Sequence, residues 1–299
     1  ERKIGKMKKI AIIGAGPAGY TLANELMIGM DELHIEIFDQ ESEIGGAIHT
    51  GIPDFRMPKA FLKKTYDRLM EAGVIFHFNT KVDAEIFNGL RNRFDEVVVA
   101  IGAQVENTFG FETGNGIVAG LTLLYDLNIR KKQDDYSMYH NAVVWGGGNV
   151  AMDCARSLKR IVDNVTIVYR RSLKEMPANP AEIKAAEKEG VKVAFLTNIK
   201  EINRDENGNV CSISAVQMEL GEMDESGRAS CHEKAGSDFV METDLVAMAI
   251  GQKVDFSVLD PQLRKTENHG STLEHVWIVG DAWLGPSTIS AAFLDGKAL

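Results

Sequence analysis

Two glycine signatures of the same kind constrain this chain more than any other feature. They are Gly14-x-Gly16-x-x-Gly19 and Gly146-x-Gly148-x-x-Ala151, which begin 132 positions apart. Each stands between an apolar strand-like run and a helix-like run, the order that opens a Rossmann-type nucleotide-binding unit. The repeat predicts an α/β fold with two Rossmann-like dinucleotide-binding domains. Two such sites in one chain of 299 residues suggest electrons passing between two cofactors.

An acidic residue strengthens the first signature. The run 8–14 is typical of a buried parallel strand, and residues 17–29 have the small and apolar residues of a helix packed on a sheet. The next strand-like run, 34–39, ends in Asp39, twenty residues after Gly19. A carboxylate at this position can accept both hydroxyls of an adenosine ribose. The helix that begins after Gly16 offers free N–H groups to a pyrophosphate.

The second signature has a different electrostatic character. The strand-like run 165–169 is followed by Arg170, Arg171 and Ser172, with no carboxylate. Guanidinium groups bind a 2'-phosphate through charge-assisted hydrogen bonds, whereas a carboxylate would repel it. We therefore expect NADP(H) rather than NAD(H) at this site.

Two later segments have features of a flavin site. Gly45 and Gly46 follow Asp39 closely and would allow backbone to lie against a flat ring. The strand-like run 275–281 ends in Gly280-Asp281, where the carboxylate could hold a ribityl hydroxyl. Ser287 or Thr288 is the expected N-cap of the final helix. The N-terminus of that helix would stabilise negative charge on the flavin through its dipole.

Two similar strands indicate where the chain passes between domains. The runs 96–103 and 244–252 both end in Ile-Gly. We predict a nucleotide domain of residues 106–250 inserted into a domain formed by residues 1–105 and 251–299. The turn signal Glu206-Asn207-Gly208-Asn209 adds a hairpin to the inserted domain.

Composition excludes several classes of protein. The formal charge of −10 disfavours nucleic-acid binding, which depends on a basic surface. Apolar runs of membrane-spanning length and a signal-peptide pattern are absent, so we expect a cytoplasmic protein without membrane contact. The three cysteines, Cys154, Cys211 and Cys231, have no metal-ligand spacing, so we expect no metal.

Taken in order, the motifs resemble a known family: the FAD- and NAD(P)-dependent oxidoreductases typified by the small subunit of glutamate synthase. More distantly, the chain is similar to adrenodoxin reductase and to the flavin portion of dihydropyrimidine dehydrogenase. The matching motifs are Gly14-Ala-Gly-Pro-Ala-Gly19, Gly45-Gly46, Gly51-Ile-Pro-Asp-Phe-Arg56-Met-Pro-Lys59, Gly146-Gly-Gly-Asn-Val-Ala-Met-Asp153, Tyr169-Arg-Arg-Ser172, Glu175-Met-Pro-Ala178 and Gly280-Asp281.

The resemblance implies FAD in the first site, NADPH in the second, and hydride transfer from nicotinamide to flavin. Asn149, Val150 and Ala151 would meet the pyrophosphate of NADPH, Arg170 and Arg171 its 2'-phosphate, and Glu182 the nicotinamide carboxamide. Gly146, Gly148 and Gly251 complete that site. The FAD site would comprise Gly14, Gly16, Pro17, Ala18, Gly19, Asp39, Gly45, Gly46, Ile48, Gly51, Ile52, Gly102, Gly280, Asp281, Ser287 and Thr288, within lining segments 46–52 and 285–288.

The chain also departs from the family pattern. Family members of the glutamate synthase type carry an N-terminal cysteine-rich segment that binds iron-sulfur clusters, and the expectation from this sequence is a chain that lacks it. His49-Thr50 stands where the family usually has Arg-Tyr, which puts the redox tuning of the flavin in doubt. A thioredoxin reductase would need a C-x-x-C dithiol, which the sequence does not contain.

Hydride transfer needs few side chains beyond those that hold the cofactors, so no catalytic residue is assigned with certainty. His49 and Glu182 are the candidates. We expect electrons to leave to a small acceptor, to an acceptor protein or to an iron-sulfur partner subunit. One alternative is a ferredoxin- or flavodoxin-NADP reductase, for which Lys59, Lys63, Lys64 and Arg68 would form a basic helix face, although an ordinary solvated face explains them as well. Another is a non-catalytic NADPH-sensing subunit of a larger complex. The oligomeric state is not encoded in these motifs.

Overall fold

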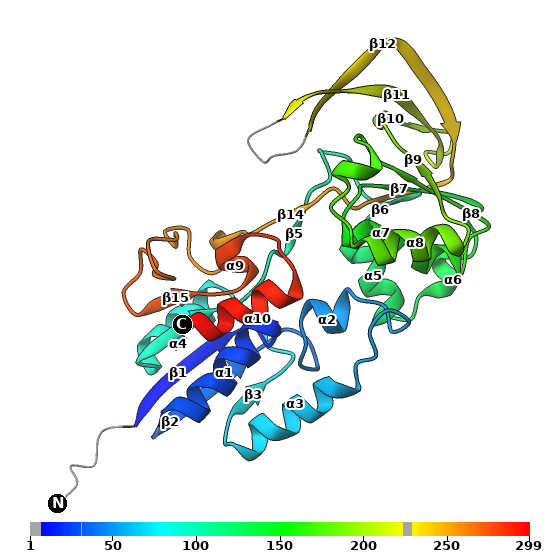
Figure 1. The fold of residues 1–299 in the computed structure, drawn as a ribbon. Coiled ribbons are helices and arrows are strands. Elements are labelled where there is room, and N and C mark those ends of the chain that lie inside the picture. The colour runs from blue at the N-terminus through cyan, green and yellow to red at the C-terminus, as the bar shows by residue number, and fades with distance from the viewer. Residues whose placement is uncertain (1–6, 31, 224–228) are drawn as a thin grey trace, which may run out of the picture. The chain divides into compact units, whose positions relative to one another are not determined.

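The computed structural model describes residues 7–30, 32–223 and 229–299 of the chain (Figure 1). Within it the chain forms two compact units. The first unit contains residues 1–105 and 252–299, and the second unit contains residues 106–251. The second unit is thus an insertion in the first. The segments that connect the units pair as a two-stranded sheet of β5 (Val105–Glu106) and β14 (Gln252–Lys253).

The first unit is built on a five-stranded sheet in which all neighbouring strands are parallel. The strand order is β15-β4-β1-β2-β3, so the strand before the first glycine signature is central. In a parallel sheet the carboxyl ends of all strands lie at one edge, where ligands bind in open α/β folds. The strands are β1 (Lys8–Ile13), β2 (Leu33–Phe38), β3 (Ile75–His77), β4 (Glu96–Val99) and β15 (Val276–Ile278).

Both faces of this sheet are buried. Along β1, Ile10 and Ile12 join one apolar cluster while Ala11 and Ile13 join another, as the alternation of side chains in a strand requires. Residues of α1, α2, α3 and α10 pack in the first cluster, and residues of α4 and α9 in the second. The helices of this unit are α1 (Pro17–Gly29), α2 (Ala47–Thr50), α3 (Ala60–Glu71), α4 (Ala84–Arg93), α9 (Asp281–Leu284), α10 (Ile289–Ala298) and the 3-10 turn η2 (Phe256–Val258).

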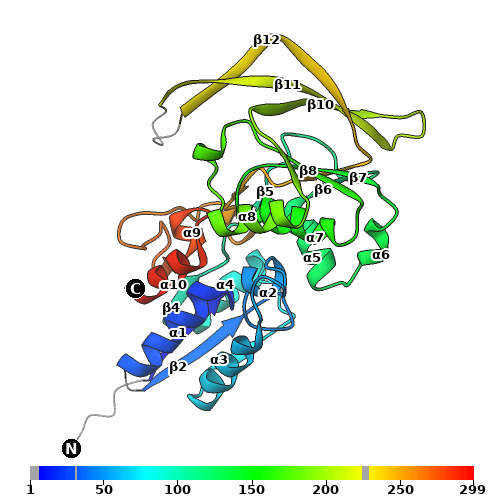
Figure 2. The same cartoon turned by 45° about the vertical axis from the view of Figure 1, so that its right-hand side comes forward.

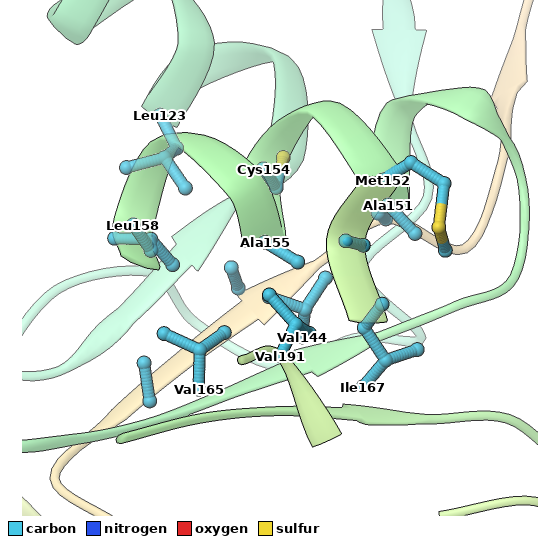
Figure 3. Close-up of a cluster of buried hydrophobic side chains, with 14 of the residues drawn as sticks. Leu123, Val144, Ala151, Met152, Cys154, Ala155, Leu158, Val165, Ile167 and Val191 are labelled. Carbon is cyan, nitrogen blue, oxygen red and sulfur yellow. The ribbon is translucent and has the colours of Figure 1, made fainter. Parts of the chain in front are cut away.

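The second unit repeats the parallel sheet with the order β6-β13-β7-β8-β9. Helix α7 covers one face of this sheet: Ala151, Ala155 and Leu158 lie against Val144 and Val165 (Figure 3). The strands are β6 (Ile117–Ala119), β7 (Asn141–Trp145), β8 (Asn164–Val168), β9 (Lys192–Ala194) and β13 (Leu245–Met248). The helices are α5 (Gly120–Asn128), α6 (Gln133–Tyr136), α7 (Asn149–Lys159), α8 (Pro180–Lys188) and the 3-10 turn η1 (Leu173–Glu175).

A three-stranded antiparallel sheet covers the other face of the second unit (Figure 2). Its strands are β10 (Thr197–Arg204), β11 (Val210–Met223) and β12 (Ala229–Glu242). The hairpin between β10 and β11 was predicted from its turn, in which Asp205 Oδ1 accepts hydrogen bonds from the N–H groups of Asn207 and Asn209, each 2.9 Å long. The third strand, β12, was not predicted. The predicted α/β class with two parallel sheets is confirmed.

Across residues 7–30, 32–223 and 229–299, none of the helices combines the length and the apolar character needed to cross a membrane. The three cysteines are free thiols, with Cys154 buried, Cys231 half-buried and Cys211 exposed.

Candidate functional site

The first glycine turn is closed by two backbone approaches that leave no room for side chains. A Cβ on Gly14, whose φ is +111°, would lie 2.3 Å from the carbonyl oxygen of Ala100, which follows β4. A Cβ on Gly19 would lie 2.0 Å from the carbonyl oxygen of Gly14. The first glycine therefore allows neighbouring strands to meet at the turn, and the third allows α1 to pack on β1.

The segment that contains Gly45 and Gly46 packs directly on this turn. Gly45 donates its N–H to the carbonyl oxygen of Ala15 at 2.9 Å, and a Cβ on Gly46 would lie 2.8 Å from the Cα of Gly16. A Cβ on Gly45 would meet Leu62 at 2.7 Å. The glycine pair was predicted to admit a flat ring, and the structure gives a further reason for it, which is the close packing of two backbone segments.

Helix α1 begins at this point without a side-chain cap. Gly16 is its N-cap and Pro17 its first residue, and α1 is 13 residues long. The N–H groups of Ala18 and Gly19 belong to the first turn, whose donors have no intrahelical acceptor. A helix start of this kind favours an anion such as a pyrophosphate.

Asp39 anchors the same turn from the end of β2. Its Oδ2 accepts the N–H of Ala15 at 2.6 Å, and its Oδ1 accepts the N–H of Glu41 at 2.8 Å. Burial raises the pKa of this carboxyl above its ordinary value, although the two backbone N–H bonds act in the opposite direction. Each carboxylate oxygen can accept more than one hydrogen bond, so Asp39 retains the capacity to bind a ribose hydroxyl.

The residues expected around Asp281 lie together in the described chain. Ser287 donates its hydroxyl to Asp281 Oδ1 at 2.5 Å. Thr288 is the N-cap of α10, as predicted, and its Oγ1 accepts the N–H of Ala291 at 3.1 Å. Gly280, just before Asp281, has a φ of +68°.

The remaining residues expected at the flavin site differ in their exposure. Ile48 and Ile52 are buried in the core, and Gly51 is the C-cap of α2. Gly102 has a φ of +69°, with open space where a Cβ would lie. His49 Nδ1 lies 3.9 Å from Glu43 Oε2, and the side chain of His49 is largely buried at 16% exposure.

The second glycine turn repeats the first one closely. A Cβ on Gly146, whose φ is +144°, would lie 2.1 Å from the carbonyl oxygen of Ala249. Helix α7 also starts without a side-chain cap, with Gly148 as its N-cap. Ala151 replaces the third glycine and is fully buried, and Val150 is half-buried beside it. Gly251 has a φ of +102°.

The two units differ at the residue after the second strand. In the first unit Asp39 donates its N–H to the carbonyl oxygen of His77, and in the second unit Tyr169 donates to that of Ala194. Tyr169 thus occupies the position equivalent to Asp39. Its ring would lie 2.4 Å from a Cβ on Gly147, so it packs under the glycine turn.

Arg170 and Arg171 are not equivalent. Arg170 is exposed, whereas Arg171 is 6% exposed and donates its Nε–H to the carbonyl oxygen of Ala229 in β12 at 2.7 Å. The sequence interpretation treated the two as a pair. Arg171 connects the loop after β8 to the antiparallel sheet, and Arg170 is the guanidinium that faces solvent.

Glu182 has a partner that the sequence did not reveal. Its Oε2 accepts a hydrogen bond from Arg156 on α7, with 2.5 Å between the oxygen and Nη1. Arg156 also pairs with Glu189 at 2.7 Å. The expected contact of Glu182 with a carboxamide would therefore involve a carboxylate already engaged within its own unit.

The segment 176–179 contacts the second glycine turn, and the sequence analysis did not predict this contact. Ala178 donates its N–H to the carbonyl oxygen of Gly147 at 3.1 Å, and Asn179 donates its N–H to Asn149 Oδ1 at 2.9 Å. The available signal was the pair of prolines, Pro177 and Pro180, which indicates a rigid segment.

The basic face expected on α3 is partly neutralised. Lys59 donates to the carbonyl oxygen of His49 at 2.9 Å and pairs with Asp54 at 3.1 Å. Lys63 pairs with Asp67 at 2.7 Å. Two of the four cations proposed for docking therefore have carboxylate partners on the same protein.

The first unit fits the nucleotide half of FAD by three observations. Helix α1 has an uncapped start, the approach of Gly46 to Gly16 forms a backbone surface free of side chains beside it, and Asp39 stands at the end of the adjacent strand. The second unit offers the same uncapped helix start together with Arg170.

Comparisons with known proteins agree with this geometry. The family model for pyridine nucleotide-disulphide oxidoreductases matches residues 8–296. The NADP(+)-dependent formate dehydrogenase subunit beta of Moorella thermoacetica is 35% identical over 97% of this chain and 42% of its own length. The glutamate synthase [NADPH] small chain of Escherichia coli strain K12 is 34% identical over 82% of this chain and 54% of its own length. The chain thus spans about half the length of these curated relatives.

A solved structure supports the fold. Mycobacterium tuberculosis FprA in complex with NADPH superimposes with a TM-score of 0.81 at 20% identity, over 98% of this chain and 83% of that one. The prediction of two Rossmann-like domains and the resemblance to the glutamate synthase small chain are both confirmed. The chain belongs to the pyridine nucleotide-disulphide oxidoreductase family.

Proposed function

We propose that the first unit binds FAD, that the second unit binds NADPH, and that electrons enter at the second unit and leave from the first. The observation that carries this proposal is the difference between two otherwise similar glycine turns. Asp39 stands after the second strand of the first unit, and Tyr169 followed by the exposed Arg170 stands at the equivalent place in the second. A carboxylate suits a free ribose, and a guanidinium suits a 2'-phosphate.

The residues of the first unit would bind and orient FAD. The uncapped start of α1 would donate N–H groups to the pyrophosphate, Asp39 would accept ribose hydroxyls, and Asp281 would accept a ribityl hydroxyl. FAD supplies two-electron exchange with a pyridine nucleotide. No side chain of the unit has to move a proton for that exchange.

The residues of the second unit would select NADPH. The start of α7 at Asn149 would receive the pyrophosphate, with Val150 and Ala151 in the same turn. Arg170 would bind the 2'-phosphate, and Arg171 would hold the loop against β12. Glu182 would support NADPH binding indirectly. Its ion pair with Arg156 fixes the first turn of α8 relative to α7.

We further propose that the electron acceptor is a partner subunit or a small molecule. Two of the relatives are described as a subunit beta and a small chain, which supports work within a larger assembly. The alternative of a ferredoxin- or flavodoxin-NADP reductase loses support because Lys59 and Lys63 pair with carboxylates of their own chain. The remaining alternative is a non-catalytic subunit that senses NADPH.

Rapid mixing under anaerobic conditions tests the proposal. The chain reconstituted with FAD is mixed with NADPH, and the visible absorbance of the flavin is followed. We expect rapid bleaching with NADPH and slower bleaching with NADH at equal concentration. Persistence of the flavin absorbance would disprove the proposal, and steady NADPH oxidation with ferricyanide would exclude the sensor.

A further inference from the structure

Helix α10 carries a carboxylate whose side chain is buried. Asp295 is 8% exposed and belongs to the last turns of Ile289–Ala298. Burial imposes a desolvation penalty on a carboxylate unless its charge has good hydrogen-bond partners.

Within the part of the chain that the structure describes, Asp295 has two hydrogen-bond partners, each from a different segment. His269 Nε2 lies 2.9 Å from Asp295 Oδ1, and the backbone N–H of Gly280 donates to Oδ2 at 2.6 Å. The ring of His269 stacks on Trp283 of α9 with the centroids 4.9 Å apart. Asp295 thus connects α10, the loop that contains His269 and the turn after β15.

The turn held by Asp295 contacts the start of α1. A Cβ on Gly280 would lie 2.6 Å from the Cβ of Ala18, and a Cβ on Gly296 would lie 2.5 Å from the carbonyl oxygen of Ala18. The turn at Gly280 and helix α10 therefore both pack closely against the first turn of α1. A buried N–H without an acceptor is costly, and Asp295 accepts the N–H of Gly280 at this turn.

We infer that Asp295 is a positioning residue for the flavin site. By accepting the N–H of Gly280 it fixes the turn that presents Asp281, and it holds this turn against the helix start that receives the pyrophosphate. His269 orients the carboxylate from the other side. The inference rests on the proposed binding of FAD to the first unit, and it assigns a positioning function to Asp295 and His269.

Titration of FAD into the FAD-free chain tests this inference by the dissociation constant and by the visible spectrum of the bound flavin. We expect Asp295→Ala to weaken FAD binding about tenfold or more, because a buried N–H is left without an acceptor. Asp295→Asn should stay within about threefold of the wild type, because its amide oxygen can still accept from Gly280. His269→Ala should weaken binding about threefold, since Asp295 keeps one of its two bonds.

The matched control is Asp126→Ala in the second unit. Asp126 is also 8% exposed and lies near the end of a helix, where it accepts from Arg130 and Tyr136. Its loss should lower stability and leave the dissociation constant of FAD unchanged. Retained NADP+ binding by Asp295→Ala verifies that the second unit is folded.

The outcomes separate the inference from the proposed function. If the wild type binds FAD and Asp295→Ala binds it equally well, or if Asp126→Ala weakens FAD as strongly, the inference is wrong. If Asp295→Ala does not fold, His269→Ala decides, and unchanged FAD binding by that variant overturns the inference. A wild type that takes up no FAD overturns the proposed function and the inference with it.

Discussion

At the scale of single residues, the described hydrogen bonds beside the glycine turns include several in which a side chain holds backbone. Asp39 accepts the N–H groups of Ala15 and Glu41, and Asn149 accepts that of Asn179. In each case the acceptor fixes the backbone beside a glycine turn. Replacing a residue that binds a ligand and also holds the turn changes both ligand affinity and the stability of the fold. Unfolding of the ligand-free protein measures the effect on stability alone.

Replacement of Asp39 should therefore affect the protein before any cofactor binds. We expect Asp39→Ala to lower the free energy of unfolding by about 2–4 kcal/mol, because two N–H groups lose their acceptor. Asp39→Asn should have a smaller effect, since one oxygen remains to accept. Urea unfolding of the FAD-free chain measures both. Equal stability of Asp39→Ala and the wild type would show that these hydrogen bonds contribute nothing to the fold.

Arg170 and Arg171 should respond differently to replacement by alanine. Arg170→Ala should weaken NADPH about tenfold or more and NADH little, because an exposed charge-assisted contact to a phosphate is lost. Arg171→Ala should weaken both nucleotides and lower stability, because Arg171 holds the loop to Ala229. The dissociation constants of both variants for NADPH and for NADH, together with their stability to urea, test this difference. Equal losses of NADPH and NADH affinity in Arg170→Ala would contradict the assignment.

The sequence predicted the glycines better than it predicted the charged residues. Gly14 and Gly146 are required by local turns, and local turns have a recognisable spacing. The burial of Arg171 depends on Ala229, 58 residues away, and the pairing of Glu182 depends on Arg156, 26 residues away. No local pattern encodes such contacts, so the sequence predicted Arg171 as a ligand contact and Glu182 as a ligand contact or catalytic candidate, and neither protein partner was predicted.

At the scale of elements, strands that end in a glycine turn could be predicted from the sequence. A strand without such a turn signal, β12, could not. Helix α1 begins at Pro17 and ends at Gly29, as expected. Strand β12 was missed because most of its first half is exposed and lacks the apolar alternation of a half-buried strand. Its position depends on pairing with β11 rather than on its own composition.

The contact between α7 and α8 should depend on pH. Hydrogen bonds from Arg156, with a further contribution from Arg160, lower the pKa of Glu189 to about 2. A carboxyl whose folded pKa lies below its unfolded value of about 4.3 stabilises the fold at neutral pH, and this contribution is lost as the pH falls from about 4.3 through about 2.

Glu189→Gln should therefore lower the free energy of unfolding by about 1–2 kcal/mol at neutral pH, after allowance for partial solvent exposure. The difference from the wild type should shrink as the pH falls below about 4. Urea unfolding across this range measures it, with Glu187→Gln, an exposed position on the same helix, as the control. A difference independent of pH would exclude the ion pair as its cause.

At the scale of the whole molecule, the second unit is an insertion in the first, and the proposed function predicts that the two cofactors protect separate units of the chain. FAD should slow amide hydrogen exchange in residues 8–19, 39–46 and 280–288, and NADP+ should slow it in residues 146–151 and 170–182. A ligand that binds only the native state stabilises it by about 2.7 kcal/mol at one hundred times its dissociation constant. Because each unit has its own buried core, each ligand should stabilise mainly the unit that binds it.

Hydrogen exchange followed by mass spectrometry, with each ligand added alone, measures this pattern of protection. Protection of the same unit by both ligands would contradict the assignment of FAD to the first unit and NADPH to the second.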